Sequence, residues 1–110
     1  MRRLVETYNE IEGFHYWPNA SGNEKYLSYK HRHIFTIRCR FWVSHNDREI
    51  EFNSRQNEIE DFLVNSFGRP CQFGAFSCES LAQAIMDYYG DCCISCTVLE
   101  DGNGGATLTR

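Results

Sequence analysis

Between residues 30 and 44 the sequence alternates between two kinds of side chain, and this alternation restricts the fold more than any other feature. Odd-numbered positions carry His31, His33, Phe35, Ile37, Cys39, Phe41 and Val43, and even-numbered positions carry Arg32, Ile34, Thr36, Arg38, Arg40 and Trp42. A period of two predicts a long β-strand, because successive side chains of a strand point to opposite faces of its sheet. The odd-numbered face is the more apolar one, so we expect it to face the core.

The segments around this strand indicate its neighbours. An earlier strand is expected at residues 4–12, followed by a loop rich in proline, asparagine, glycine and serine. After the long strand, HNDRE predicts a turn, and REIEF (residues 48–52) is expected to return as the antiparallel partner. A final strand is predicted over residues 93–100, with Ile94, Cys96, Val98 and Glu100 on one face.

Two helices are predicted between these strands. The first covers residues 53–67, with Asn53 or Ser54 as its N-cap, and its apolar stripe is Ile59, Phe62, Leu63 and Phe67. The second starts at the N-cap Ser77 and ends before Gly90, and its stripe is Leu81, Ala84, Ile85 and Tyr88. The order of elements predicts one α+β domain over residues 1–110, an antiparallel sheet with two helices packed on one face.

Composition excludes several classes of partner. The chain has 110 residues and a net charge of −4, which argues against a protein that coats nucleic acid. No apolar stretch is long enough to span a bilayer, so no membrane association is expected. The N-terminus turns polar after two apolar residues, which predicts a cytoplasmic protein whose six cysteines are reduced. Cys93 and Cys96 are expected on opposite faces of the last strand, a poor arrangement for a chelate.

The pair His31 and His33 stands at the start of the long strand, on the face predicted to be buried. Spacing alone favours an ordinary pair of histidines satisfied by hydrogen bonds. A catalytic zinc site needs three protein ligands and an open position. His15 is the one plausible third ligand, because His45 lies at the far end of the long strand, roughly 40 Å from His33. If a site of three histidines exists, it therefore consists of His15, His31 and His33.

Glu100 ends the apolar face of the last strand, at the edge of the predicted sheet, where the sequence turns to DGNGGA. A carboxylate there suits two parallel N–H donors, such as those at the edge of a guanine-like ring. The alternative is a solvated charge at a strand end, and that alternative is favoured for Glu100 taken alone.

The order of these segments resembles the 6-pyruvoyltetrahydropterin synthases and the related 6-carboxytetrahydropterin synthases of deazapurine biosynthesis. GFHYW is similar to the first zinc-histidine segment of that family, and KHRHIFTIRC to its His-Gly-His strand, with Arg32 in place of glycine. REIEFNSRQNEIEDFL is similar to the stretch that leads into the first helix, and FSCESLAQAI to the Pro-Thr-x-Glu helix start. VLEDGNGGA is similar to the strand whose glutamate anchors the pterin. The resemblance covers residues 4–107.

The resemblance implies a tunnelling fold (T-fold), in which subunits join their sheets into a barrel. A homo-oligomer, tetramer or hexamer, would then have its sites between subunits, and Thr36, Arg38 and Arg40 would line the tunnel. It also implies Zn²⁺ on His15, His31 and His33, acting as a Lewis acid, with Glu100 and Glu79 binding a pterin-like or purine-like ring. Lys25, Lys30 or Arg32 would meet the phosphates of the substrate.

The sequence departs from the family at the positions of its catalytic cysteine and of its Asp-His pair, the residues that transfer protons. The catalytic cysteine of the family would stand at Leu27, and the connection GRPCQFGAF lacks the family's Asp-His pair. Cys71, in that connection, is a conceivable replacement for the thiol. One hypothesis is therefore a zinc-dependent lyase or hydrolase acting on a pterin or purine nucleotide such as 7,8-dihydroneopterin triphosphate. The alternatives are an inactive T-fold protein that binds or sequesters such a ligand, and an oligomer in which zinc only pins the loop after His15.

Overall fold

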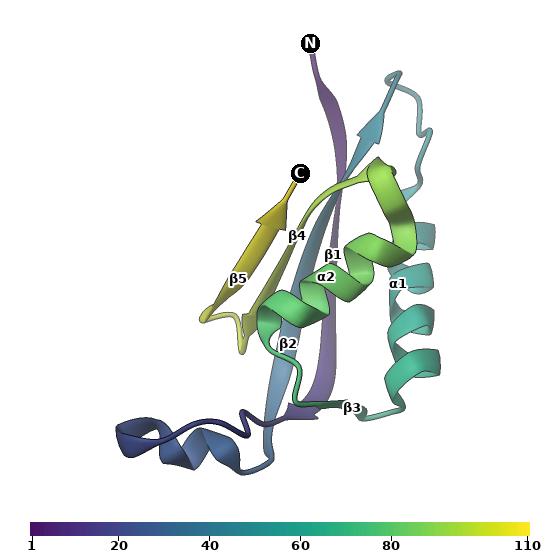
Figure 1. Ribbon diagram of the computed structural model, residues 1–110. Coiled ribbons are helices and arrows are strands. Elements are labelled where there is room, and N and C mark those ends of the chain that lie inside the picture. Colours follow the sequence, from purple (N-terminus) through teal and green to yellow (C-terminus); the bar gives the residue numbers. More distant parts are fainter.

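The computed structural model describes all 110 residues and shows an α+β domain built on a five-stranded sheet (Figure 1). The elements in chain order are β1 (Arg3–His15), the 3₁₀ helix η1 (Gly22–Ser28), β2 (His31–Val43), α1 (Phe52–Phe67), β3 (Cys71–Gly74), α2 (Cys78–Tyr89), the 3₁₀ helix η2 (Gly90–Cys92), β4 (Cys93–Glu100) and β5 (Gly104–Thr109). The predicted α+β class and both predicted helices are confirmed.

The sheet has the strand order β3-β1-β2-β4-β5. β1 pairs with the whole of β2 in antiparallel register, from Arg3 opposite Val43 to His15 opposite His31. The pairs β2–β4 and β4–β5 are antiparallel as well, whereas the short strand β3 runs parallel to β1. The sheet is therefore mixed, and the prediction of a purely antiparallel sheet was wrong at β3.

The predicted return strand over residues 48–52 does not form. The chain after β2 turns through bends, and α1 begins at Phe52. The Glu51 carboxylate accepts hydrogen bonds from the backbone N–H groups of Asn53 and Ser54, so that Glu51 is the N-cap of α1 and not part of a strand. The predicted N-caps, Asn53 and Ser54, lie inside α1. Their backbone N–H groups, which have no partner within the helix, are satisfied by the Glu51 carboxylate.

Both helices pack on one face of the sheet, α1 against β1, and α2 against β4 and β5 (Figure 1). The odd-numbered face of β2 lies beneath them, as the alternation predicts. The core there contains Phe35, Ile37, Cys39 and Phe41 from β2, Ile59 and Leu63 from α1, and Leu81 and Ile85 from α2. Two positions of the predicted stripe of α2 differ, because Ala84 is half-buried and Tyr88 is exposed while Ala82 and Met86 are buried.

β4 contains an irregularity that changes which cysteines face the core. The register between β2 and β4 shifts between Arg40 and Phe41, so that Cys39 lies opposite Cys96 but Phe41 lies opposite Cys93. Both Cys93 and Cys96 are fully buried as a result, although they are three residues apart. The predictions that these two thiols face opposite sides, and that Ile94 shares the buried face, were wrong because a bulge inserts one extra residue.

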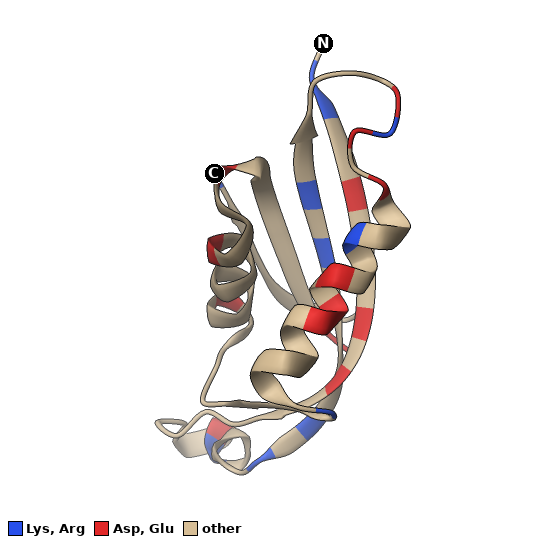
Figure 2. Ribbon diagram, turned by 90° about the vertical axis from the view of Figure 1, so that its right-hand side faces the viewer, with Lys and Arg blue, Asp and Glu red and all other residues tan.

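The other face of the sheet carries polar side chains and no helix. Arg40 forms an ion pair with Glu6 at 2.6 Å, Arg32 pairs with Glu12, and Thr97 and Thr107 share a hydrogen bond across β4 and β5. Charged residues recur along β1 and β2 in Figure 2. No helix of the structure has the length and apolarity that crossing a membrane requires.

Candidate metal centre

The three predicted histidines meet at the end of the sheet where β1 finishes and β2 begins. His15 is the last residue of β1 and lies directly opposite His31, the first residue of β2. His33 lies two residues along β2, on the same face. The ring centroids are 4.6 Å apart for His15 and His31, 5.4 Å for His15 and His33, and 5.0 Å for His31 and His33. The antiparallel register thus brings together three side chains from two strands.

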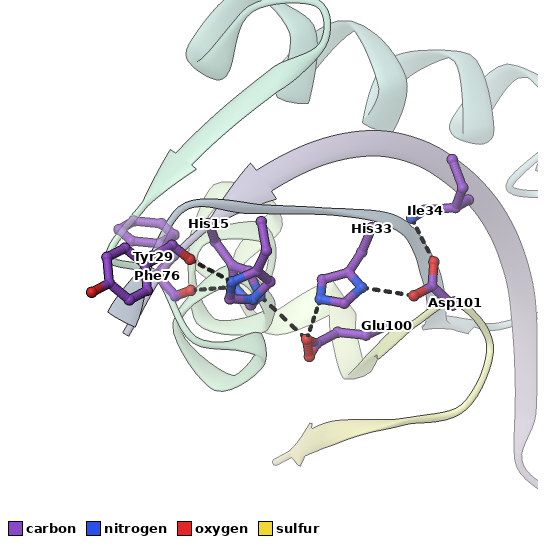
Figure 3. Close-up of polar contacts among 8 residues, drawn as sticks. His15, Tyr29, His33, Ile34, Phe76, Glu100 and Asp101 are labelled. Carbon is purple, nitrogen blue, oxygen red and sulfur yellow. Dashed lines mark hydrogen bonds and ion pairs between the residues drawn. The ribbon is translucent and has the colours of Figure 1, made fainter. Parts of the chain in front are cut away.

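Each histidine uses its Nδ1 atom for a hydrogen bond to an oxygen (Figure 3). The acceptors are the carbonyl of Phe76 for His15 at 2.9 Å, the carbonyl of Tyr29 for His31 at 2.8 Å, and the Asp101 carboxylate for His33 at 2.7 Å. These oxygens only accept, so the proton of each neutral ring lies on Nδ1 and the lone pair on Nε2. Such outer contacts are typical of metal-binding histidines, because they fix the tautomer and the orientation of the ring.

Glu100 completes the cluster. Its Oε1 atom lies 2.9 Å from His33 Nε2 and 3.2 Å from His15 Nε2. One ligand atom from each of His15, His31, His33 and Glu100 lies within 4.8 Å of the other three. His33 Nε2 is buried and has no hydrogen-bond partner. Three imidazole nitrogens and one carboxylate oxygen are a donor set that suits zinc and other divalent first-row metals. The four residues therefore fit a bound metal ion.

The turn between β4 and β5 positions the acidic residues. Asp101 and Gly102 both have positive φ, and the Asn103 N–H donates to the Glu100 carbonyl, as in a type I′ hairpin turn. Asp101 accepts hydrogen bonds from the Ile34 N–H and from His33, and these contacts, the Ile34 one first, lower the pKa of the carboxyl group. Asp101 was not predicted from the sequence, although an Asp-Gly pair after a strand is a signal for such a turn.

A pocket of about 350 Å³ opens beside the cluster. Its walls include His15 and His31, the aromatic residues Tyr16, Trp17 and Phe76, and the carboxylates of Glu79 and Glu100. The cluster thus lies at a cavity wall that offers flat apolar side chains and two acceptors. These aromatic residues were not predicted from the sequence: Phe76 reaches the pocket from the loop before α2, whereas Tyr16 and Trp17 directly follow His15.

The three basic residues named as candidates for phosphate binding, Lys25, Lys30 and Arg32, are not among the residues that line this pocket. Arg32 pairs with Glu12 and belongs to the opposite face of β2. The Lys30 ammonium group stands over the ring of Phe14, 5.0 Å from its centroid. Glu79 and Glu100 are the predicted substrate-binding residues that the structure brings to the pocket, and within one chain Lys30 and Arg32 are not among the residues that line it.

Cys71, considered from the sequence as a conceivable replacement for the family's thiol, does not line the pocket. It is fully buried, and its thiol contacts the Leu63 carbonyl in the core. Leu27 lines the pocket, as does Cys78 at the start of α2. Burial raises the pKa of the Cys78 thiol to about 11, with further contributions from the negative charges of Glu100 and Glu79. Cys78 is therefore a protonated thiol at neutral pH.

Comparison with known proteins adds no assignment to this geometry. No protein-family model matches the sequence, and a search of curated proteins found no match either.

Proposed function

We propose that this chain is a metal-dependent protein of the 6-pyruvoyltetrahydropterin and 6-carboxytetrahydropterin synthase type, acting on a pterin or purine nucleotide such as 7,8-dihydroneopterin triphosphate. The observation that carries the proposal is the convergence of three histidines, each ring held by an Nδ1 hydrogen bond, beside a pocket whose wall includes His15 and His31. Zinc on His15, His31 and His33 would supply a Lewis acid that stabilises enolate-like negative charge on a substrate oxygen.

The pocket residues supply the remaining recognition. The carboxylates of Glu79 and Glu100 are placed to accept the N–H donors at the edge of a pterin or guanine-like ring. Trp17, Tyr16 and Phe76 offer aromatic surface for the faces of that ring. Cys78 is the thiol in the pocket wall, and its raised pKa keeps it protonated, so that it is not a thiolate nucleophile.

The proposal includes the T-fold and its assembly. The uncovered polar face and the outer strands β3 and β5 leave surfaces through which sheets of neighbouring subunits would join into a barrel. A homo-oligomer, tetramer or hexamer, would bring the charged residues of a neighbouring subunit toward the pocket. Native mass spectrometry tests this assembly, and a protein that remains monomeric at micromolar concentration would contradict it.

The enzymatic proposal is tested with 7,8-dihydroneopterin triphosphate and zinc-loaded protein. We expect loss of the triphosphate substrate by mass spectrometry, abolished by chelation and by His31→Ala. His45→Ala is the matched control, because His45 is an exposed histidine outside the cluster. Absence of turnover at stoichiometric enzyme concentration would contradict a catalytic role.

A specific observation favours a second candidate, a T-fold protein that binds or sequesters its ligand without turnover. Leu27 occupies the pocket wall where the resemblance places the nucleophilic cysteine. In this case pterin or purine nucleotides raise the melting temperature, Glu79→Gln weakens that effect, and the nucleotide is recovered unchanged. A ligand that is consumed, or one that gives no thermal shift, would contradict this candidate.

A further inference from the structure

The cluster contains one more donor atom than an open catalytic centre needs. A catalytic zinc centre has three protein ligands, which His15, His31 and His33 already provide. Glu100 nevertheless places one oxygen against two of these rings, 2.9 Å from His33 Nε2 and 3.2 Å from His15 Nε2.

These two contacts are not hydrogen bonds of neutral rings. The Nδ1 atom of His33 faces the Asp101 carboxylate and that of His15 faces the Phe76 carbonyl, so both Nδ1 atoms carry the proton. The Nε2 atoms then direct lone pairs at an oxygen that also offers lone pairs. A proton or a metal ion among the three atoms removes the repulsion, and three imidazoles with one carboxylate are a donor set that suits a divalent metal.

The separations are compatible with atoms that share one metal ion. Two ligand atoms that each lie about 2.0–2.1 Å from a tetrahedral zinc are roughly 3.3 Å apart. The distance between His15 Nε2 and Glu100 Oε1 is 3.2 Å, and the distance from His33 Nε2 is somewhat shorter at 2.9 Å.

The backbone fixes Glu100 in this place. Glu100 pairs with Phe35 across β2 and β4, and Phe35 lies on the same face of β2 as His33. The turn that follows is anchored by Asp101, whose carboxylate binds both the Ile34 N–H and His33. Glu100 is therefore held toward the metal position by the same turn that orients one of the ligands.

We infer that Glu100 is the fourth protein ligand of the metal and closes the centre in the resting protein. This inference rests on the metal ion of the proposed function. The position that a substrate oxygen would take is then occupied by Glu100, and it opens when the N–H donors of an arriving ring draw the carboxylate away. Ring recognition and opening of the metal centre are in this way two uses of one side chain.

Cobalt(II) bound to the wild-type protein tests the inference, with azide as a small anionic probe of open coordination positions. We expect the intense visible absorption of a four-coordinate ion, and we expect azide to leave this spectrum unchanged. In Glu100→Gln, azide should shift the spectrum, and the affinity for cobalt(II) should fall at least about tenfold. Glu24→Gln is the matched control: an exposed carboxylate outside both the cluster and the pocket, expected to behave as wild type.

The outcomes separate this inference from the proposed function. An azide response of wild-type protein equal to that of Glu100→Gln would overturn the fourth ligand and leave the three-histidine centre standing. If Glu100→Gln does not fold, the azide titration of the wild-type protein decides alone. A closed centre without turnover or nucleotide binding would support the inference and reject the function. A protein that binds no cobalt(II) would reject both.

Discussion

At the residue scale, the three clustered histidines differ from His45 in the partner of Nδ1. Nδ1 of His45 accepts a hydrogen bond from the Asp47 N–H, which places the ring proton on Nε2. In the cluster Nδ1 donates instead, and Nε2 is left with its lone pair. The same residue type therefore has a free Nε2 lone pair at three positions, where it could bind a metal ion, and is an ordinary surface group at the fourth.

The thiols give a prediction at the same scale. The pKa of Cys78 is raised to about 11, so at pH 8 roughly one part in a thousand is thiolate, the form that reacts with alkylating agents. Cys92 is the exposed cysteine. We expect iodoacetamide at pH 8 to label Cys92 in the native protein and to leave Cys78 largely unmodified, with labelling of Cys78 rising as the pH approaches 11. Peptide mass spectrometry measures both sites, and equal labelling at pH 8 would contradict the prediction.

At the element scale, the hairpin of β4 and β5 requires glycine at one position. A Cβ atom on Gly105 would lie 1.9 Å from the Val98 carbonyl oxygen, whereas a Cβ on Gly104 would meet nothing within 4 Å. The close approach lets β5 pair with β4, which makes β4 an interior strand, not the sheet edge that the sequence suggested for Glu100.

Alanine substitutions at these two glycines test that requirement. Gly105→Ala should lower the free energy of unfolding by about 1–3 kcal/mol, because backbone must move to relieve the overlap. Gly104→Ala, one residue earlier, should change stability little. Chemical denaturation compares the stability of the two variants with that of the wild type. Equal denaturation midpoints for all three proteins would show that the close approach of Gly105 to the Val98 carbonyl does not require glycine.

At the scale of the whole molecule, the cluster connects strands that are distant in the sequence. His15 comes from β1, His31 and His33 from β2, and Glu100 from β4. Metal binding to the folded cluster stabilises the native state by mass action, by about 2.7 kcal/mol when the free metal concentration is a hundred times the dissociation constant.

Thermal denaturation with and without zinc measures the stabilisation of the native state by metal binding. We expect zinc to raise the melting temperature of the wild-type protein and of His45→Ala, and a chelator to reverse the increase. His15→Ala should lose most of the increase while keeping a cooperative transition without metal, since the core beneath the helices does not include the cluster. A zinc-dependent increase of equal size in His15→Ala would place the metal elsewhere.

Local periodicities in the amino-acid sequence were enough to predict the main layers of the fold. Alternation in residues 30–44 placed Phe35 and Ile37 in the core and His31 and His33 on the same face, because side-chain direction in a strand depends on spacing alone. Helix starts such as Ser77 could be recognised because capping is a contact within one turn. The three-histidine set followed from elimination among four histidines.

Tertiary structure alone decided what depends on register and on residues far apart in the chain. The bulge in β4 buried both Cys93 and Cys96, and Glu51 ended the segment expected as a strand by capping α1. The contact of Glu100 with His15 spans 85 positions of sequence and exists because β2 lies between β1 and β4. No local sequence pattern encodes the distance between Glu100 and His15, because the pairing of the strands in the whole sheet sets that distance.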